Sequence, residues 1–227
     1  MTTSPLPKQL SAAVCVVWDF DGVIADTEPC QARAYELVLA QFGVECESGW
    51  FDPFVGTTER GIWPTLIAEH GLAASVNDLV AARSDVYLGQ AETLTPAWYV
   101  QQVLDLAVPH HIVSAGNHDQ IVRLLDRWEI GHRFASVRAT GSPSMAVDGD
   151  KESRLLNMLG EVGAGVVLFE DSPRYLELAR AFGATTVGVR HSLNQRYLGA
   201  DLIVDHRQPG IWSKVTDGDR TRPPTTR

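Results

Sequence analysis

Six short runs rich in apolar and β-branched residues recur along the chain, separated by segments with helical periodicity. The runs are VCVVWDF (14–20), HHIVSAG (110–116), FASVRA (134–139), GVVLFED (165–171), ATTVGVR (184–190) and DLIVDH (201–206). Parallel strands that are covered by helices on both faces give this alternation. The sequence therefore predicts an α/β fold, with a Rossmann-like three-layer core around a parallel sheet.

The interval between Asp26 and Pro96 follows a different pattern, because it holds no strand of similar quality. Glycines at positions 43, 71 and 89 each end a helical pattern, where a left-handed cap is expected. The three clearest helical segments are QARAYELVLAQFG (31–43), TERGIWPTLIAEHG (58–71) and VNDLVAARSDVYLG (76–89). We therefore predict an all-helical insert after the first strand.

These patterns divide the chain into three parts. Residues 1–27 and 96–212 form the predicted α/β core, and residues 28–95 form the helical insert. Residues 213–227 are polar and contain prolines, so they have nothing to bury. We expect this tail to be disordered.

Composition limits the class of function. The 227 residues are 44% hydrophobic and 21% charged, as in a soluble enzyme. A net charge of −9 argues against nucleic acid, because binding a phosphate backbone normally needs a basic face. The N-terminus lacks a signal-peptide pattern, and no run of about 18 apolar residues suits a membrane. Three cysteines without metal spacing favour a reducing compartment. We expect a cytoplasmic protein with no membrane partner, as a monomer or homodimer.

Chemically active side chains stand at the predicted strand ends. The first strand ends in Asp19-Phe20-Asp21-Gly22, the second in Ser114-Ala115-Gly116-Asn117 and the fourth in Glu170-Asp171-Ser172. Lys151 begins the helix that leads to the fourth strand. The carboxyl ends of parallel strands gather around one crevice, so these residues are expected to meet. Clustered carboxylates repel one another, and oxygen ligands suit a hard cation such as Mg²⁺.

A phosphate group fits the same place. Once a cation neutralises the acids, a phosphate can be held by the Ser114 hydroxyl, by backbone N–H groups of the Ala115–Gly116 turn, with Asn117 beside them, and by the Lys151 ammonium. One carboxylate can then attack phosphorus. The expected partner is a small phosphorylated metabolite.

Four segments, DFDGVIADTE, IVSAGN, DKESRLL and LFEDSP, resemble in this order the four motifs of the haloacid dehalogenase superfamily. The resemblance covers roughly residues 12 to 206, and it is to the β-phosphoglucomutase and phosphatase branch, which has a helical cap after the first motif. Each motif alone has a plainer explanation, such as a turn at Asp-Gly or a helix start at Ser-Pro. Their coincidence in the family's order makes those explanations improbable.

The resemblance implies a mechanism. Asp19 is then the nucleophile that forms an aspartyl-phosphate, and Asp21 is the general acid and base. Mg²⁺ is held by Asp19, the Asp21 carbonyl and Asp171, with Glu170 directly or through water. Dehalogenases of the superfamily lack the second aspartate, so phosphoryl transfer is favoured. We expect a Mg²⁺-dependent phosphatase acting on a small phosphate monoester.

Two alternatives remain open, a sugar phosphomutase of the β-phosphoglucomutase type and a non-catalytic binding module of this fold. Related mutases carry a histidine where this chain has Gln31, which favours a hydrolase. The lysine motif lacks the usual Lys-Pro at Lys151, and Tyr175 stands where relatives often have glycine.

Residues in the helical insert are candidates for substrate specificity. Gly56 and Thr57 resemble the cap's specificity loop, and Glu59 stands where sugar-phosphate enzymes often have arginine. One hypothesis is that Glu59 disfavours a second anionic group and that aromatics such as Trp63 line an apolar wall. The favoured alternative is that these aromatics form the core of the insert.

Overall fold

The computed structural model describes residues 5–54, 57, 59–143, 149–193 and 199–214. The chain divides into two compact units, one of Met1–Asp26 with Thr95–Arg227 and one of Thr27–Leu94. We call them the core unit and the helical unit. None of the helices in the described part of the chain is both long and apolar enough to cross a bilayer.

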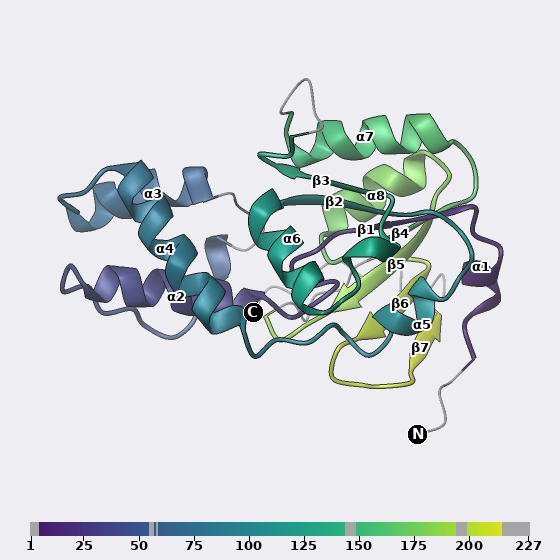
Figure 1. Ribbon diagram of the computed structural model, residues 1–227, viewed down its shortest axis with the longest axis horizontal. Helices are drawn as coiled ribbons and strands as arrows, with labels where there is room; N and C mark the ends of the chain where they lie inside the picture. Colours follow the sequence, from purple (N-terminus) through teal and green to yellow (C-terminus); the bar gives the residue numbers. More distant parts are fainter. Residues whose placement is uncertain (1–4, 55–56, 58, 144–148, 194–198, 215–227) are drawn as a thin grey trace. The chain divides into compact units, whose positions relative to one another are not determined.

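The core unit is built on one sheet with the strand order β3-β2-β1-β4-β5-β6-β7 (Figure 1). All neighbouring strands are parallel except β6 and β7. The strands are β1 (Cys15–Trp18), β2 (His110–Asn117), β3 (Ser136–Thr140), β4 (Val166–Glu170), β5 (Thr185–Arg190), β6 (Leu202–Asp205) and β7 (Trp212–Lys214). The six strands expected from the sequence are all present, and the predicted α/β class is confirmed.

Helices cover both faces of this sheet (Figure 1). The helices of the core unit are α1 (Lys8–Ser11), α5 (Val100–Leu104), α6 (His118–Arg127), the 3-10 helix η2 (Gly131–Arg133), α7 (Lys151–Val162) and α8 (Pro173–Ala181). Successive residues of a strand point to opposite faces. Accordingly Cys15 and Val17 of β1 pack with residues of α7 and α8, whereas Trp18 stacks on Phe169 with ring centroids 4.4 Å apart.

Buried strands explain why polar groups are confined to the strand ends. Every residue of β1 and of β4 is buried, so an interior polar side chain there would need a partner. The first polar side chains after β1 and at the end of β4 therefore fall at the carboxyl edge of the sheet. This edge is where the crevice of an open parallel sheet lies.

The strand β7 was not predicted, and its presence shortens the expected tail. Trp212 pairs with Val204 and Ser213 with Ile203, so β7 adds an antiparallel edge to β6. The ring of Trp212 also packs 5.6 Å from that of Trp98. The rest of the predicted tail, residues 215–227, lies outside the described residues.

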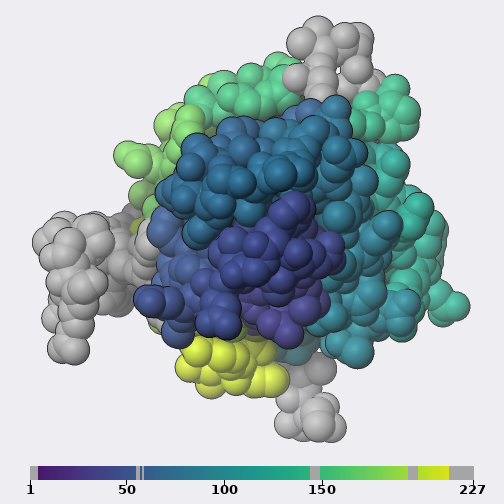
Figure 2. Space-filling view, turned by 90° about the vertical axis from the view of Figure 1, so that its left-hand side faces the viewer, coloured from purple at the N-terminus to yellow at the C-terminus, as the bar shows by residue number. Residues whose placement is uncertain are grey.

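The helical unit contains α2 (Glu28–Ala40), the 3-10 helix η1 (Asp52–Phe54), α3 (Glu59–His70) and α4 (Val76–Ala91). Figure 2 shows their atoms, in purple and blue, packed as one continuous layer. Gly43 and Gly71 follow α2 and α3 with the expected positive φ, at 76° and 62°. Gly89 is different, because α4 continues past it to Ala91, so the prediction of a cap at this glycine was wrong.

Candidate active site

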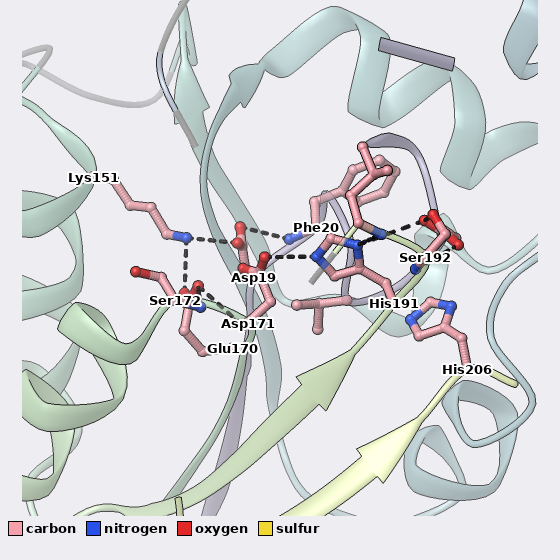
Figure 3. Close-up of polar contacts among 12 residues, drawn as sticks. Asp19, Phe20, Lys151, Glu170, Asp171, Ser172, His191, Ser192 and His206 are labelled. Atoms are coloured by element: carbon pink, nitrogen blue, oxygen red, sulfur yellow. Dashed lines mark hydrogen bonds and ion pairs between the residues drawn. The ribbon is translucent and has the colours of Figure 1, made fainter. Parts of the chain in front are cut away.

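Asp19 directly follows the buried residues of β1. Its backbone N–H donates to the carbonyl of Phe169 in β4 at 2.9 Å, which extends the strand pairing by one residue. Asp19 is only 5% exposed, and its Oδ1 accepts the N–H of Phe20 at 2.7 Å. The carboxylate is therefore held in one orientation at the edge of the sheet (Figure 3).

Lys151 reaches this carboxylate from the first turn of α7. The side chain of Asp150 accepts the N–H of Ser153 at 2.8 Å and so caps the helix at its first residue. From there Nζ of Lys151 lies 2.6 Å from Oδ2 of Asp19 and 2.8 Å from Oε2 of Glu170 (Figure 3). The lysine joins the end of β1 to the end of β4, although the sequence lacks the Lys-Pro pattern.

Tyr175, in the first turn of α8, covers the same ammonium group. Nζ of Lys151 lies 4.5 Å from the centroid of the Tyr175 ring, within the range of a cation–π interaction. Tyr175, which replaces the usual glycine, is therefore in contact with Lys151, which lacks the usual following proline.

Three carboxylates converge beside the lysine. One oxygen from each of Asp19, Glu170 and Asp171 lies within 4.8 Å of the others. Glu170 is fully buried, and its Oε1 accepts the N–H groups of Asp171 and Ser172 at 3.2 and 3.0 Å. Two oxygens on opposite sides of a Mg²⁺ ion are about 4 Å apart. The spacing and the oxygen chemistry of this cluster therefore fit a small divalent cation.

The charges of the cluster are strongly coupled. Burial opposes the charge of Lys151, but Asp19 and Glu170 raise its pKa, so the side chain stays an ammonium. Burial raises the pKa of Asp19, as does the nearby Asp171 carboxylate, while Lys151 lowers it. Burial also raises the pKa of Glu170. A second positive charge would relieve this crowding, as a bound cation does.

The end of β2 differs in shape from the expected turn. The strand runs on to Asn117, with a shift of register against β3 between Val113 and Asn117. Oγ of Ser114 accepts the N–H of Gly116 at 3.0 Å, and the Ser114 carbonyl accepts Nη1 of the buried Arg154 at 2.8 Å. Nothing in the sequence pattern marked Arg154, which holds the backbone of the expected phosphate-binding segment.

Asn117 closes this segment and caps the next helix. Its side-chain oxygen accepts the N–H groups of Asp119 and Gln120 at 3.0 and 3.2 Å, at the start of α6. The side chain of Ser114 is 1% exposed, whereas Asn117 is exposed. The amide oxygen of Asn117 is thus used by the helix.

Asp21 lies against the same segment. A β-carbon built on Gly116 would come within 2.7 Å of Oδ2 of Asp21 and 3.3 Å of Oγ of Ser114. The bare Cα of Gly116 therefore allows the Asp21 carboxylate and the Ser114 hydroxyl to come together. The structure thus brings the end of β1 next to the end of β2.

His191 is a site residue that the sequence analysis missed. It follows β5 directly, it is fully buried, and its Nε2 lies 3.0 Å from Oδ2 of Asp171 (Figure 3). The end of β5 therefore contributes to the site as well. A rule that examined every strand end would have found it, since ATTVGVR was already predicted as a strand.

The candidate specificity residues have structural roles in the helical unit. Trp63 is fully buried among its apolar residues, as the favoured alternative proposed, so it does not line an exposed wall. Glu59 pairs with Nη1 of the buried Arg83, which offers a structural reason for its charge. Gln31 is half-buried in α2, and Thr57 is exposed and donates its N–H to the Phe54 carbonyl at 2.8 Å. The candidate at position 56 lies outside the described residues.

Comparison with known proteins agrees with this geometry. The pattern of the haloacid dehalogenase-like hydrolase family matches residues 16–189. A phosphorylated carbohydrates phosphatase of Thermotoga maritima is 26% identical over 187 residues, which cover 79% of this chain and 86% of that protein.

Solved structures share the fold. The structure of CbbY from Rhodobacter sphaeroides in complex with phosphate has a TM-score of 0.68 at 15% identity, covering 85% of this chain and 93% of that one. The β-phosphoglucomutase of Clostridium difficile has a TM-score of 0.66 at 14% identity, covering 85% and 91%.

A parallel sheet covered by helices, with carboxylates and a lysine gathered at its carboxyl edge, defines the class of the chain as an α/β protein with a candidate active site at the strand ends. The chain belongs to the haloacid dehalogenase-like hydrolase family, and the resemblance found in its four motifs is confirmed.

Proposed function

We propose that this protein is a Mg²⁺-dependent phosphatase that hydrolyses a phosphorylated carbohydrate, or a similar small phosphate monoester, through an aspartyl-phosphate. The metal would be held by Asp19, Asp171 and the backbone carbonyl of Asp21, and by Glu170 directly or through water. When bound, Mg²⁺ supplies positive charge that offsets the charge of the phosphate group and of the transition state. The observation that carries this proposal is the cluster of three carboxylates within 4.8 Å of one another, two of which, Asp19 and Glu170, pair with Lys151.

In the first step Asp19 attacks phosphorus. A carboxylate oxygen of Asp19 forms a bond to phosphorus as the bond from phosphorus to the substrate oxygen breaks. Asp21 gives its proton to the leaving alkoxide, and such a transfer contributes about 10²–10⁴-fold to the rate. The Phe20 N–H and Lys151 hold the attacking carboxylate in place. Lys151 and the Ser114 segment bind the phosphate oxygens.

In the second step water hydrolyses the aspartyl-phosphate. Asp21, now a carboxylate, accepts a proton from water as the water oxygen bonds to phosphorus. The bond from phosphorus to Asp19 breaks, and the electron pair returns to the Asp19 carboxylate. Inorganic phosphate leaves, and both aspartates regain their starting protonation. Each turnover thus consumes one water and produces one alcohol and one phosphate.

The similarity to a phosphorylated carbohydrates phosphatase supports the substrate class. The fold is also shared with a β-phosphoglucomutase, so a phosphomutase is the second candidate. A mutase must keep its phospho-aspartate away from water, and Gln31 in place of the histidine of related mutases favours the hydrolase. A long-lived phosphoenzyme and activation by a sugar bisphosphate would instead support the mutase.

Phosphate release tests the proposal. The purified protein is incubated with Mg²⁺ and p-nitrophenyl phosphate, and then with a panel of phosphorylated sugars, polyols and nucleotides. We expect release of phosphate that EDTA abolishes and added Mg²⁺ restores. Asp19→Asn should be inactive, whereas Asp105→Asn, a matched change at an exposed carboxylate, should keep full activity. An active Asp19→Asn variant would exclude the covalent mechanism, and a protein inactive on the whole panel would favour a binding module.

A further inference from the structure

His191 is packed tightly against the loop that follows β1. The residue is fully buried, and a β-carbon at Gly22 would lie 2.8 Å from its Cδ2 and 2.9 Å from its Nε2. Gly22 has a φ of 70°, so the backbone here has the left-handed conformation that glycine favours. The imidazole ring thus occupies space that the absence of a side chain at Gly22 leaves open.

The hydrogen bonds of the ring assign its two nitrogens different roles. The N–H of Leu193 donates to Nδ1 at 3.4 Å, so Nδ1 acts as an acceptor. Nε2 then carries the proton and donates it to Oδ2 of Asp171 at 3.0 Å. This is the arrangement in which an imidazole orients a carboxylate that ligates a metal.

Asp26 fixes the segment that carries the histidine. Its Oδ2 accepts the N–H of Ser192 at 3.2 Å, and its Oδ1 accepts the Ser192 hydroxyl at 3.0 Å. Oδ1 also lies 3.8 Å from Nδ1 of His191. The ring is therefore held by its own loop, by Asp26 and by the packing at Gly22, independently of Asp171.

We propose that His191 is a positioning residue for the metal site, in which its Nε2–H fixes the carboxylate of Asp171 in the orientation that binds the cation. The inference rests on the metal site of the proposed function. A carboxylate that a buried hydrogen-bond donor already holds in one orientation binds a divalent cation with less ordering cost.

Two substitutions separate the hydrogen bond from the packing. His191→Leu fills the space but cannot donate, whereas His191→Gln places an amide N–H near the position of Nε2. We expect His191→Leu to weaken Mn²⁺ binding, measured by electron paramagnetic resonance without substrate, by about 10- to 100-fold. The Mg²⁺ concentration for half-maximal phosphatase activity should rise by a similar factor, while kcat at saturating Mg²⁺ changes little. His191→Gln should restore most of the affinity.

Matched controls decide the outcome. His111→Leu makes the same change at a histidine that is only partly buried, bonds to Ser136 and lies at the opposite end of the sheet, and it should leave Mn²⁺ binding unchanged. If His191→Leu does not fold, His191→Asn serves instead, because its shorter amide falls short of Asp171 while that of glutamine reaches it. Unchanged Mn²⁺ affinity in His191→Leu, or equal loss in the glutamine and asparagine variants, overturns the proposal.

The metal readout also distinguishes this inference from the proposed function. If the wild-type protein binds Mn²⁺ more tightly than His191→Leu does but releases no phosphate, the phosphatase function is contradicted and the positioning role stands. If the wild-type protein hydrolyses phosphate esters but His191→Leu binds Mn²⁺ equally well, only the positioning role is contradicted. If the wild-type protein does not bind Mn²⁺, the positioning role is contradicted too.

Discussion

Adding one methyl group at Gly116 should disable the site without unfolding the protein. The β-carbon of Gly116→Ala would lie 2.7 Å from Oδ2 of Asp21, whereas ordinary contacts begin at 3.4 Å. Asp21 must therefore move by about 0.7 Å, because the methyl group itself is fixed to the backbone of β2. The same methyl would also be 3.3 Å from the Ser114 hydroxyl, which is a tight contact as well.

The size of the effect follows from this displacement. A misplacement of about 1 Å in a reacting group can cost about 10²-fold in rate, and general acid catalysis as a whole contributes about 10²–10⁴-fold. We expect kcat for p-nitrophenyl phosphate to fall roughly 10- to 100-fold. Because Gly116 does not need a positive φ, the free energy of unfolding should change by no more than about 1 kcal/mol.

Steady-state kinetics and thermal unfolding measure the two quantities. Gly160→Ala is the matched control, because Gly160 lies inside α7 with no atom within 4 Å of the added carbon. It should keep wild-type kcat and gain about 0.5–1 kcal/mol of stability. Since the loss acts through Asp21, Gly116→Ala should cost much less in an Asp21→Asn background. Wild-type kcat in Gly116→Ala, or full additivity with Asp21→Asn, would refute the reasoning.

Other contacts give further predictions. Arg154→Met removes the donor to the carbonyl near the end of β2 and should raise KM for the phosphate ester and lower stability by about 2 kcal/mol, as kinetics and denaturant unfolding would show. Glu59→Gln leaves the buried Arg83 uncompensated and should cost roughly 3 kcal/mol with no change in substrate preference. Burial opposes the charge of Asp205, yet hydrogen bonds from Arg207 lower its pKa in the folded protein. The stability that the ionised Asp205 contributes is therefore present above its ordinary pKa of about 4, and it is lost as the pH falls through the lower pKa of the folded state. Asp205→Asn should thus reduce the melting temperature more at about pH 6 than at about pH 3.

The sequence sufficed to predict the sheet and the main groups of the site. The apolar runs of β1 and β4 are typical of buried strands, and in a parallel sheet their ends share an edge. This topological rule brought Asp19, Lys151 and Asp171 together from segments far apart in the sequence. Side-chain directions did not have to be known, because the strand ends alone determine which residues meet.

Residues that act through other residues could not be predicted in the same way. Arg154 lies in the middle of α7, where an arginine is usually on the exposed face, and only the packed structure shows it buried against β2. His191 follows a predicted strand, so its place at the edge of the sheet could have been predicted, but its contact with Asp171 depends on the loop after β5 and on the empty space at Gly22. Neither the burial of Arg154 nor this contact leaves a local pattern in the sequence.

The helical unit shows the opposite situation, in which conspicuous residues have structural contacts of their own. Trp63 and Glu59 attracted attention because of their type and their place near the expected specificity loop. A unit of this size has a small core, and Trp63 is fully buried in it beside Tyr35. The ion pair of Glu59 with Arg83 likewise satisfies a charge that burial would otherwise make costly. In the helical unit, therefore, packing and ion pairing account for residues that type alone would assign to substrate specificity.

The charges of the site give a physical reason why the proposed mechanism uses both a divalent cation and a separate acid. Asp19, Glu170 and Asp171 carry three negative charges when ionised, and Lys151 offsets one of them. The remaining two would repel a phosphate dianion, so the approach of the substrate requires two positive charges at the cluster. Asp21 lies against Gly116 and is not one of these three carboxylates, so in the proposed mechanism it serves as the separate acid. The glycine that admits Asp21 to this position is thus as much a part of the chemistry as the acids themselves.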